Sequence, residues 1–149
     1  MVHLAGEFIG AGRWNTAKKA RICDSRVLRT RTLCQLIGQL DPPPRALVCA
    51  SAVGFYGNRG DEVLDERSSH GSGFLPQVTQ DWEAAVQPAV ERGIRVALLR
   101  FSMILSPRGG ALAQMLRPFR AGLGGRVGSR RQYWSWIFLN DALGQSTTP

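Results

Sequence analysis

Hydrophobic and polar positions divide the chain into strand-like and helix-like segments that alternate. Residues 46–53 are apolar or small on both alternating faces, which is typical of a strand covered by helices on both sides of a parallel sheet. A second apolar run of this kind covers residues 94–101. Residues 2–6 have the pattern of a strand end followed by a turn of small residues. We therefore expect several strands of one sheet.

The stretch between the strand end at residues 2–6 and the strand at 46–53 has helical periodicity. Asn15 or Thr16 is the expected N-cap, and the helix is expected to continue to about Leu40. Three consecutive prolines at residues 42–44 cannot continue a helix and lead into the strand at 46–53. The expected buried stripe of the helix is Ala20, Cys23, Val27, Thr30, Cys34 and Ile37.

A second helix is expected between the strands at 46–53 and 94–101. Pro76 suits its first turn, Pro88 disturbs its last turn, and Gly93 ends it. Its apolar face is Val78, Trp82, Ala85, Val86 and Ala89.

The C-terminal third is less regular. Residues 106–110 form a loop before a short helix at 111–120, and the glycine-rich run at 122–128 has the wrong spacing for a phosphate-binding fingerprint. Residues 132–138 alternate like an edge strand or a hairpin.

The order strand, helix, strand, helix, strand predicts an α/β fold with right-handed βαβ units on a parallel sheet. The strands are fewer than a doubly wound domain usually has. We therefore expect a partial Rossmann-type sheet from which the N-terminal βαβ half is missing.

Composition fits this fold and excludes several protein classes. The 149 residues are 44% hydrophobic and 20% charged, as in a globular domain with a core. No apolar run approaches the roughly 20 residues of a membrane span, and no signal peptide is visible. We expect no membrane insertion and an intracellular location, either cytoplasmic or mitochondrial.

Neither the cysteines nor the acidic cluster predicts a metal site. Cys23, Cys34 and Cys49 lack metal-ligand spacing, so we expect free thiols that pack in the core. The acidic residues between 61 and 66 lack the pattern of a calcium loop and are expected to form a solvated rim.

The net charge of +8 arises in the C-terminal part. Residues 92–149 contain nine arginines and one acidic residue, Asp141, whereas charges cancel over residues 1–91. Such a field suits an anionic partner, either a phosphate-bearing small molecule or a nucleic acid, although a solvated basic surface has the same composition.

Candidate chemistry lies where the strand at 46–53 ends. Ligands of open parallel sheets bind outside the carboxyl ends of the strands, so Ser51, the Gly54 backbone and the Tyr56 hydroxyl are the first candidate groups. We expect both hydroxyls to lie outside the core, so that Ser51→Ala and Tyr56→Phe affect activity more than stability.

Several stretches together resemble the atypical, epimerase-like members of the extended short-chain dehydrogenase/reductase superfamily. The resemblance covers about residues 2–141. The matching stretches are Leu4-Ala5-Gly6-Glu7, Arg13-Trp14 with Lys19, Ser25-Arg26 and Thr30, Ser51 through Gly57, Gly60-Asp61-Glu62, Phe74-Leu75, Asp81-Trp82-Glu83, Leu99-Arg100, Gly109 through Leu112, Pro118-Phe119 through Gly125, and Ser135-Trp136-Ile137 with Asp141.

The resemblance implies a single partial NAD(P)-binding domain over residues 1–149, with a substrate-lobe segment at about 102–138. It implies catalytic roles for Lys19, Ser51 and Tyr56 and no metal. The cofactor, NAD or NADP, is expected to contact Ala5, Gly6, Ser51, Ala52 and Arg100.

The chain also departs from the pattern of the superfamily. The glycine-rich first loop is not in the sequence, and Val78 and Trp82 stand where the superfamily has its Tyr-x-x-x-Lys pair. Ala52 falls where the usual active-site hydroxyl is expected, and Phe138 and Asn140 replace a histidine and an aspartate. Proton transfer by the usual route is therefore unsupported.

Three functions remain open from sequence. The first is an epimerase/dehydratase-like protein, of oxidoreductase or isomerase ancestry, that acts on a small molecule such as a nucleotide-sugar. The second is a truncated or degenerate chain without activity, with weak cofactor binding, poor solubility or self-association. The third, ranked well behind, is a nucleic-acid or polyanion binder that uses Arg126, Arg130, Arg131, Tyr133, Trp134 and Trp136.

Overall fold

The computed structural model describes residues 1–10, 12–125, 128 and 132–147. Contacts divide the chain into two compact units. The first comprises Met1–Asn58 and Leu64–Arg100, and the second comprises Arg59–Val63 and Phe101–Pro149. Arg126, Arg130 and Arg131, which the nucleic-acid hypothesis uses, lie outside the described residues.

The first unit is built on a three-stranded sheet in the order β1-β2-β3. The strands are β1 (Val2–His3), β2 (Ala46–Ala52) and β3 (Arg95–Phe101). β1 runs parallel to β2, with Val2 opposite Val48. The apolar runs therefore predicted the two longer strands to within one residue at each end.

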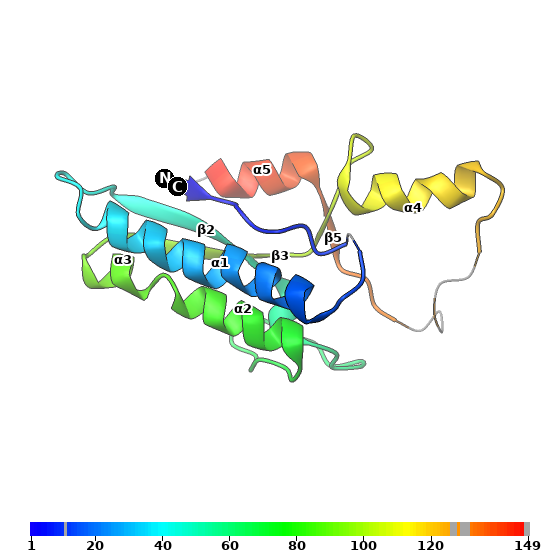
Figure 1. The fold of residues 1–149 in the computed structure, drawn as a ribbon, viewed down its shortest axis with the longest axis horizontal. Coiled ribbons are helices and arrows are strands. Elements are labelled where there is room, and N and C mark those ends of the chain that lie inside the picture. The colour runs from blue at the N-terminus through cyan, green and yellow to red at the C-terminus, as the bar shows by residue number, and fades with distance from the viewer. Residues whose placement is uncertain (11, 126–127, 129–131, 148–149) are drawn as a thin grey trace. The chain divides into compact units, whose positions relative to one another are not determined.

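The helices of the first unit lie on one face of this sheet. α1 (Thr16–Ile37) lies beside α2 (Phe74–Ala84) and α3 (Gln87–Glu91) (Figure 1). Asn15 caps α1 as predicted, because its side chain accepts a hydrogen bond from a backbone N–H of the first turn. The single second helix expected from the sequence is divided into α2 and α3, and Pro88 lies in the first turn of α3 rather than in a disturbed last turn.

The buried stripe of α1 differs from the prediction at its N-terminal end. Thr30, Cys34 and Ile37 are buried as expected, whereas Ala20 is exposed and Cys23 is only half-buried. The residues buried on α1 are Lys18, Ile22, Thr30, Cys34 and Ile37. A lysine does not count as apolar, so periodicity alone could not include Lys18 in the stripe.

The core lies between the sheet and this helix layer. Its cluster of buried residues is Cys34, Ile37, Leu47, Cys49, Val86, Ala89 and Ile94. Val48, between Leu47 and Cys49 on β2, is only half-buried, so the second face of this strand, which was also expected to be covered by helices, is the less buried one. Burial raises the pKa of the Cys49 thiol to about 12, which keeps it protonated and suits a packing role.

A buried polar chain joins β1, α1 and α2. Trp82 Nε1 donates a hydrogen bond to Thr30 Oγ1 at 2.9 Å, and the same oxygen lies 3.0 Å from His3 Nε2. The indole can only donate, so Thr30 Oγ1 accepts this bond, whereas the direction of the bond between Thr30 and a neutral His3 depends on the histidine tautomer. Desolvation by burial lowers the pKa of His3, which favours this neutral form.

We expect acid to destabilise the chain through His3. The folded form binds the His3 proton less tightly than the unfolded form, whose pKa is near 6.5. Stability is therefore complete above that pH and decreases as the pH falls through it. Urea unfolding between about pH 7 and pH 5 should show this loss, and this window lies above the ordinary titration of carboxyl groups. His3→Gln should flatten the dependence, and His70→Gln, at the other and exposed histidine, should not. An unchanged slope in His3→Gln would contradict this assignment.

The second unit contains a two-stranded sheet and two helices. β4 (Met103–Leu105) pairs in parallel with β5 (Trp136–Phe138), and the helices are α4 (Gly110–Arg120) and α5 (Leu139–Thr147). The parallel pairing shows that the hairpin alternative for residues 132–138 is wrong. Sequence reasoning missed β4, because only Ser102 separates it from the apolar run of β3.

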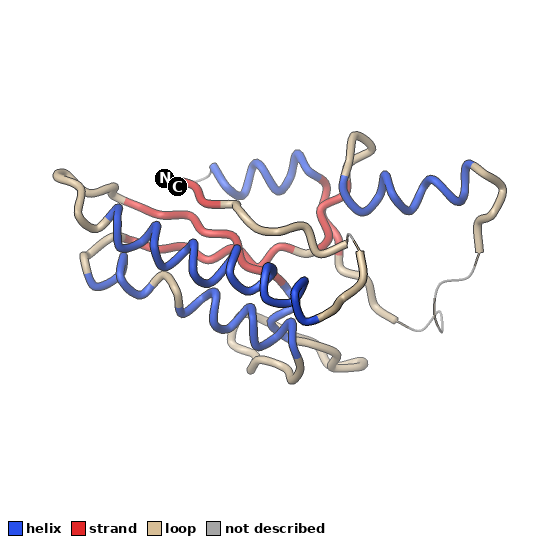
Figure 2. Tube along the Cα trace, viewed as in Figure 1, coloured by secondary structure: helices blue, strands red, loops and turns tan. Residues whose placement is uncertain are grey.

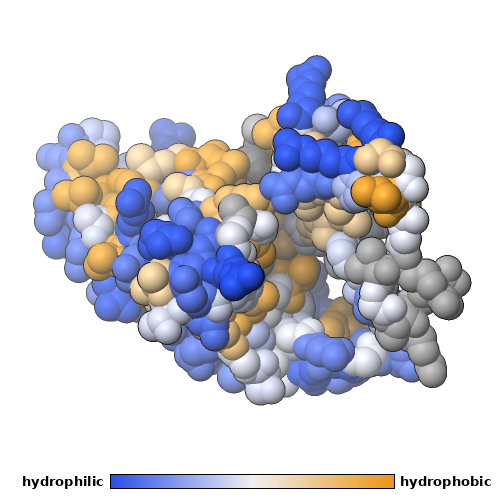
Figure 3. Space-filling model, turned by 45° about the vertical axis from the view of Figure 1, so that its right-hand side comes forward, coloured by the Kyte–Doolittle hydropathy of each residue, from blue (hydrophilic) through white to orange (hydrophobic). Residues whose placement is uncertain are grey.

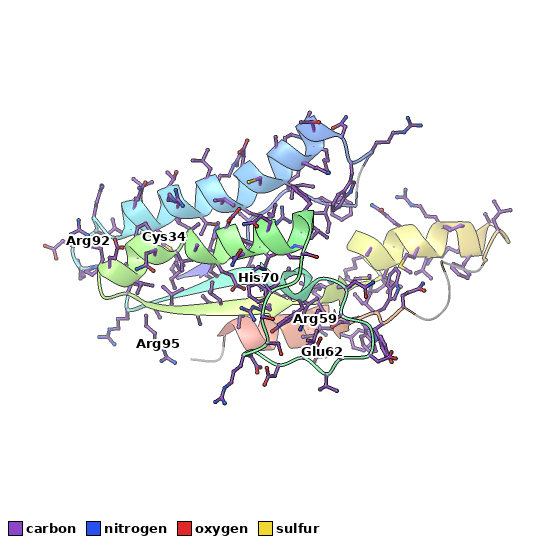
Figure 4. All side chains as sticks on the ribbon, turned by 90° about the horizontal axis from the view of Figure 1, so that it is seen from below. Cys34, Arg59, Glu62, His70, Arg92 and Arg95 are labelled. Atoms are coloured by element: carbon purple, nitrogen blue, oxygen red, sulfur yellow. The ribbon has the colours of Figure 1, made fainter. Side chains whose placement is uncertain are left out.

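A long loop connects β2 and α2, drawn in tan in Figure 2. The acidic residues of this loop are exposed, which confirms the predicted solvated rim. Arg59 and Glu62 form a two-pronged ion pair there, with both N···O distances at 2.7 Å (Figure 4).

Two further features were sought among the described residues: helices that could span a membrane and groups of side chains that could bind a metal ion. None of their helices is long and apolar enough to cross a membrane, and none of their His, Cys, Asp and Glu side chains gather in groups suited to a metal ion. Apolar and charged side chains are interleaved on the face shown in Figure 3.

Candidate functional site

Four polar side chains meet where β2 and β3 end. Ser51 is the next-to-last residue of β2, and Arg100 is the next-to-last residue of β3. Glu83, near the end of α2, bonds to both of them. This shared partner places the carboxyl ends of the two strands at one edge of the sheet, where ligands of such folds bind. Tyr56 completes the group, which we call the strand-end cluster: Ser51, Tyr56, Glu83 and Arg100.

Glu83 is the acceptor at the centre of the strand-end cluster. Its Oε1 accepts from Ser51 Oγ at 2.5 Å and from Arg100 Nε at 2.8 Å, and its Oε2 accepts from Arg100 Nη2 at 2.8 Å. The two parallel bonds from Arg100 are the strong, directional form of this pair. The Glu83 side chain is 13% exposed and the Arg100 side chain 21%.

The charges of this pair are fixed at neutral pH. Burial raises the pKa of Glu83, but the hydrogen bonds from Arg100 and Ser51 outweigh burial and leave the pKa below its ordinary value. Hydrogen bonding to Glu83 raises the pKa of Arg100 above its already high value. The carboxylate and the guanidinium are therefore both ionised.

Arg100 also contacts the aromatic pair after β2. Its Nη1 donates to the Tyr56 hydroxyl at 2.9 Å and to the carbonyl of Glu66 at 3.4 Å. Its guanidinium carbon lies 3.6 Å from the centre of the Phe55 ring, a close cation–π contact. Arg100 is thus held by α2, by the aromatic pair and by the long loop.

A short 3₁₀ helix, η1 (Val53–Tyr56), aims the two rings. Phe55 and Tyr56 meet edge to face at 5.3 Å, and the N–H of Gly71 donates to the carbonyl of Phe55 at 2.9 Å. The sequence pattern placed candidate groups at this strand end but did not predict a helix. The long loop that follows η1 returns to it at Gly71, and this hydrogen bond to Phe55 holds η1 in place.

Small residues lie at the same edge of the sheet as the strand-end cluster. Ala5 and Gly6 follow β1 and are exposed, and Ala52 ends β2. Since β1 and β2 are parallel neighbours, these residues lie at the same edge. A dinucleotide can approach the backbone closely at such positions because no large side chain intervenes.

Two cations of α1 hold the loop after β1. Lys18 Nζ pairs with Glu7 Oε1 at 2.8 Å and donates to the carbonyl of Phe8 at 2.6 Å. Arg26 Nη2 donates to the carbonyl of Glu7 at 3.1 Å. A Cβ on Gly6 would lie 3.2 Å from the guanidinium carbon of Arg26, so a larger residue would press against this clamp.

Lys19 makes its described contact with an aromatic ring outside the strand-end cluster. Its ammonium lies 5.2 Å from the centre of the Phe74 ring, at the start of α2. The contacts described for Lys19 include neither Ser51 nor Tyr56. Its neighbour Lys18 is the buried lysine, so adjacent lysines in the sequence have different environments.

Of the residues predicted for the site, the structure joins Ser51, Tyr56 and Arg100. The expectation that Ser51 lies outside the core is wrong, because the residue is only 3% exposed and bonds to Glu83. Sequence reasoning missed Glu83 as a site residue. Its signal was present in the matched stretch Asp81-Trp82-Glu83, but its partners are distant in sequence.

No family model matches the chain. Curated relatives match it over most of its length. An epimerase family protein of Mycobacterium bovis is 47% identical over 143 residues, which are 96% of this chain and 47% of that protein. A chloroplastic epimerase family homologue of Arabidopsis thaliana is 38% identical, over 96% of this chain and 41% of that protein. The chain thus spans about half the length of the curated relatives it matches.

Solved structures also resemble this chain. The nucleoside-diphosphate sugar epimerase of Corynebacterium glutamicum is 41% identical with a TM-score of 0.81, over 97% of this chain and 30% of that one. Human epimerase family protein SDR39U1, crystallised with NADPH, is 35% identical with a TM-score of 0.88, over 96% of this chain and 49% of that one. The predicted α/β fold with a parallel, partial Rossmann-type sheet is confirmed.

Proposed function

Because this chain belongs to the epimerase-like group of the extended short-chain dehydrogenase/reductase superfamily, we propose that it contributes to an NAD(P)-binding protein with oxidoreductase or isomerase chemistry. The observation that carries the proposal is the strand-end cluster, at the same edge of the sheet as the small residues that follow β1 and end β2. The NADPH in the human relative supports NADP as the nucleotide.

The residues at this edge fit a dinucleotide. Ala5, Gly6 and Ala52 offer backbone without bulky side chains at the carboxyl ends of adjacent parallel strands. Lys18 and Arg26 keep the Gly6 loop in place through Glu7. When bound, the nucleotide supplies hydride transfer, whereas the protein orients the reacting groups.

We propose a small molecule of the nucleoside-diphosphate sugar class as the substrate. The name of the Corynebacterium relative and the excess of arginine after residue 91 both support an anionic substrate. We assign the substrate lobe, expected over about residues 102–138, to the second compact unit, which comprises Arg59–Val63 and Phe101–Pro149.

Titration of the 149-residue chain with NADPH, followed by nucleotide fluorescence, tests the proposed cofactor. We expect saturable binding that Gly6→Val weakens at least tenfold, because the added side chain would stand where a dinucleotide approaches the exposed backbone. Gly109→Ala is the matched control, since a Cβ there meets nothing within 4 Å. Absence of saturable binding, or equal binding by Gly6→Val, would contradict the proposed cofactor site.

A further inference from the structure

We infer that the Glu83–Arg100 ion pair sets the direction of two hydroxyl groups, so that Tyr56 presents its proton to a bound ligand and Ser51 serves as a buried positioning residue. This inference deepens the proposed function and rests on it for the identity of the ligand. It reassigns Ser51 and Arg100 from ligand contacts to support of Tyr56.

The chemistry of Glu83 fixes Ser51. A carboxylate can only accept hydrogen bonds, so the proton of Ser51 must point at Glu83. Ser51 is 3% exposed, which leaves its oxygen almost no surface to offer a ligand. The hydroxyl therefore anchors the carboxylate, which in turn holds Arg100.

The chemistry of Arg100 fixes Tyr56 in the opposite sense. A guanidinium has no acceptor, so the Tyr56 oxygen must accept from Nη1. The phenolic proton is then directed elsewhere, and among the described residues no acceptor is paired with it. Tyr56 is half-buried, so this proton lies at a partly open surface.

The arrangement selects the chemistry of the ligand. A hydrogen bond received from a cation polarises the phenol and strengthens its own O–H as a donor. Its partner is therefore an acceptor oxygen, such as a sugar hydroxyl, a carbonyl or a phosphate oxygen. Arg100 itself has little left to offer a ligand, because its donors already meet Glu83, Tyr56 and the carbonyl of Glu66.

Raman spectroscopy of a single-tyrosine chain tests the direction of these bonds. Tyr133→Phe leaves Tyr56 as the only tyrosine. The intensity ratio of the tyrosine Fermi doublet is high when the phenolic oxygen accepts from a strong donor. Without any nucleotide we expect a ratio above that of a phenol that only donates, a fall of this ratio in Arg100→Met, and no change in Arg95→Met, the control on the same strand. A ratio typical of a phenol that only donates would overturn the inference without any further variant.

A second measurement tests the ligand-facing proton with UDP-glucose as the probe. Calorimetry should show that Tyr56→Phe weakens binding about tenfold, which corresponds to one good hydrogen bond. Equal binding by Tyr56→Phe would overturn the ligand role of Tyr56. If the unsubstituted chain does not bind UDP-glucose, the proposed substrate class fails, and the Raman ratio still decides the hydroxyl directions.

Discussion

Gly71→Ala is expected to destabilise the chain by about 1–3 kcal/mol, the range for forcing an extra methyl group into packed structure. The new Cβ would collide with the carbonyl oxygen of Tyr56 and lie 2.7 Å from its carbonyl carbon and 2.9 Å from the Cα of Gly57. These are backbone atoms, which cannot move aside as a flexible side chain can. The hydrogen bond from the Gly71 N–H to the carbonyl of Phe55 would be displaced with them.

The same substitution should disturb the strand-end cluster. Phe55 and Tyr56 both contact Arg100, so a shift of η1 pulls on the ion pair with Glu83. Urea unfolding measures the loss of stability, and Gly109→Ala is the control because its backbone is extended and a Cβ there meets nothing. A Gly71→Ala chain as stable as this control would show that the loop does not fix η1.

Elements with a strong local signal could be predicted from the sequence. The apolar runs gave β2 and β3, and the helical face of residues 78–89 is buried as expected. Pro88 and the Asn15 cap act through their own backbone chemistry, which is why local rules locate them. The aromatic turn after β2 was predicted as the site because strand ends hold ligands in such folds.

Features that depend on distant partners could not be predicted. Lys18 can be buried because Glu7 and the carbonyl of Phe8 accept hydrogen bonds from its ammonium group. The periodic pattern instead predicted Ala20 and Cys23 as the buried residues of this part of α1. Glu83 joins Ser51, which lies 32 residues away, and Arg100, which lies 17 residues away. No pattern of apolar spacing contains that information, so the sequence located the hydroxyls but not the charges that orient them.

Removing Glu83 should cost more stability than removing one partner of an exposed ion pair such as Arg59–Glu62. Glu83→Ala would leave a mostly buried guanidinium and the Ser51 hydroxyl without their acceptor. Removing one partner of a buried pair typically costs about 3–5 kcal/mol. Because the Arg100 side chain is 21% exposed and water can reach part of it, we expect about 2–3 kcal/mol. Urea unfolding at neutral pH measures the change.

The Arg59–Glu62 pair supplies the control. It has similar two-pronged geometry, but the Glu62 side chain is 48% exposed, so Glu62→Ala should change stability by less than about 1 kcal/mol. If Glu83→Ala and Glu62→Ala lower the free energy of unfolding equally, the strand-end cluster stabilises the fold no more than the exposed pair does.

The double substitution Glu83→Ala with Arg100→Met should be more stable than Glu83→Ala alone. The single variant retains an uncompensated cation, and methionine removes that charge while it keeps apolar contact with Phe55. The pH dependence follows the same logic. The lowered pKa of Glu83 makes its contribution to stability complete above its ordinary value of 4.5 and lost as the pH falls through the folded value. Glu83→Ala should therefore reduce the loss of stability below about pH 4.5. For the double substitution, a variant less stable than Glu83→Ala alone would show that Arg100 stabilises the fold through Phe55 and Tyr56 rather than through Glu83.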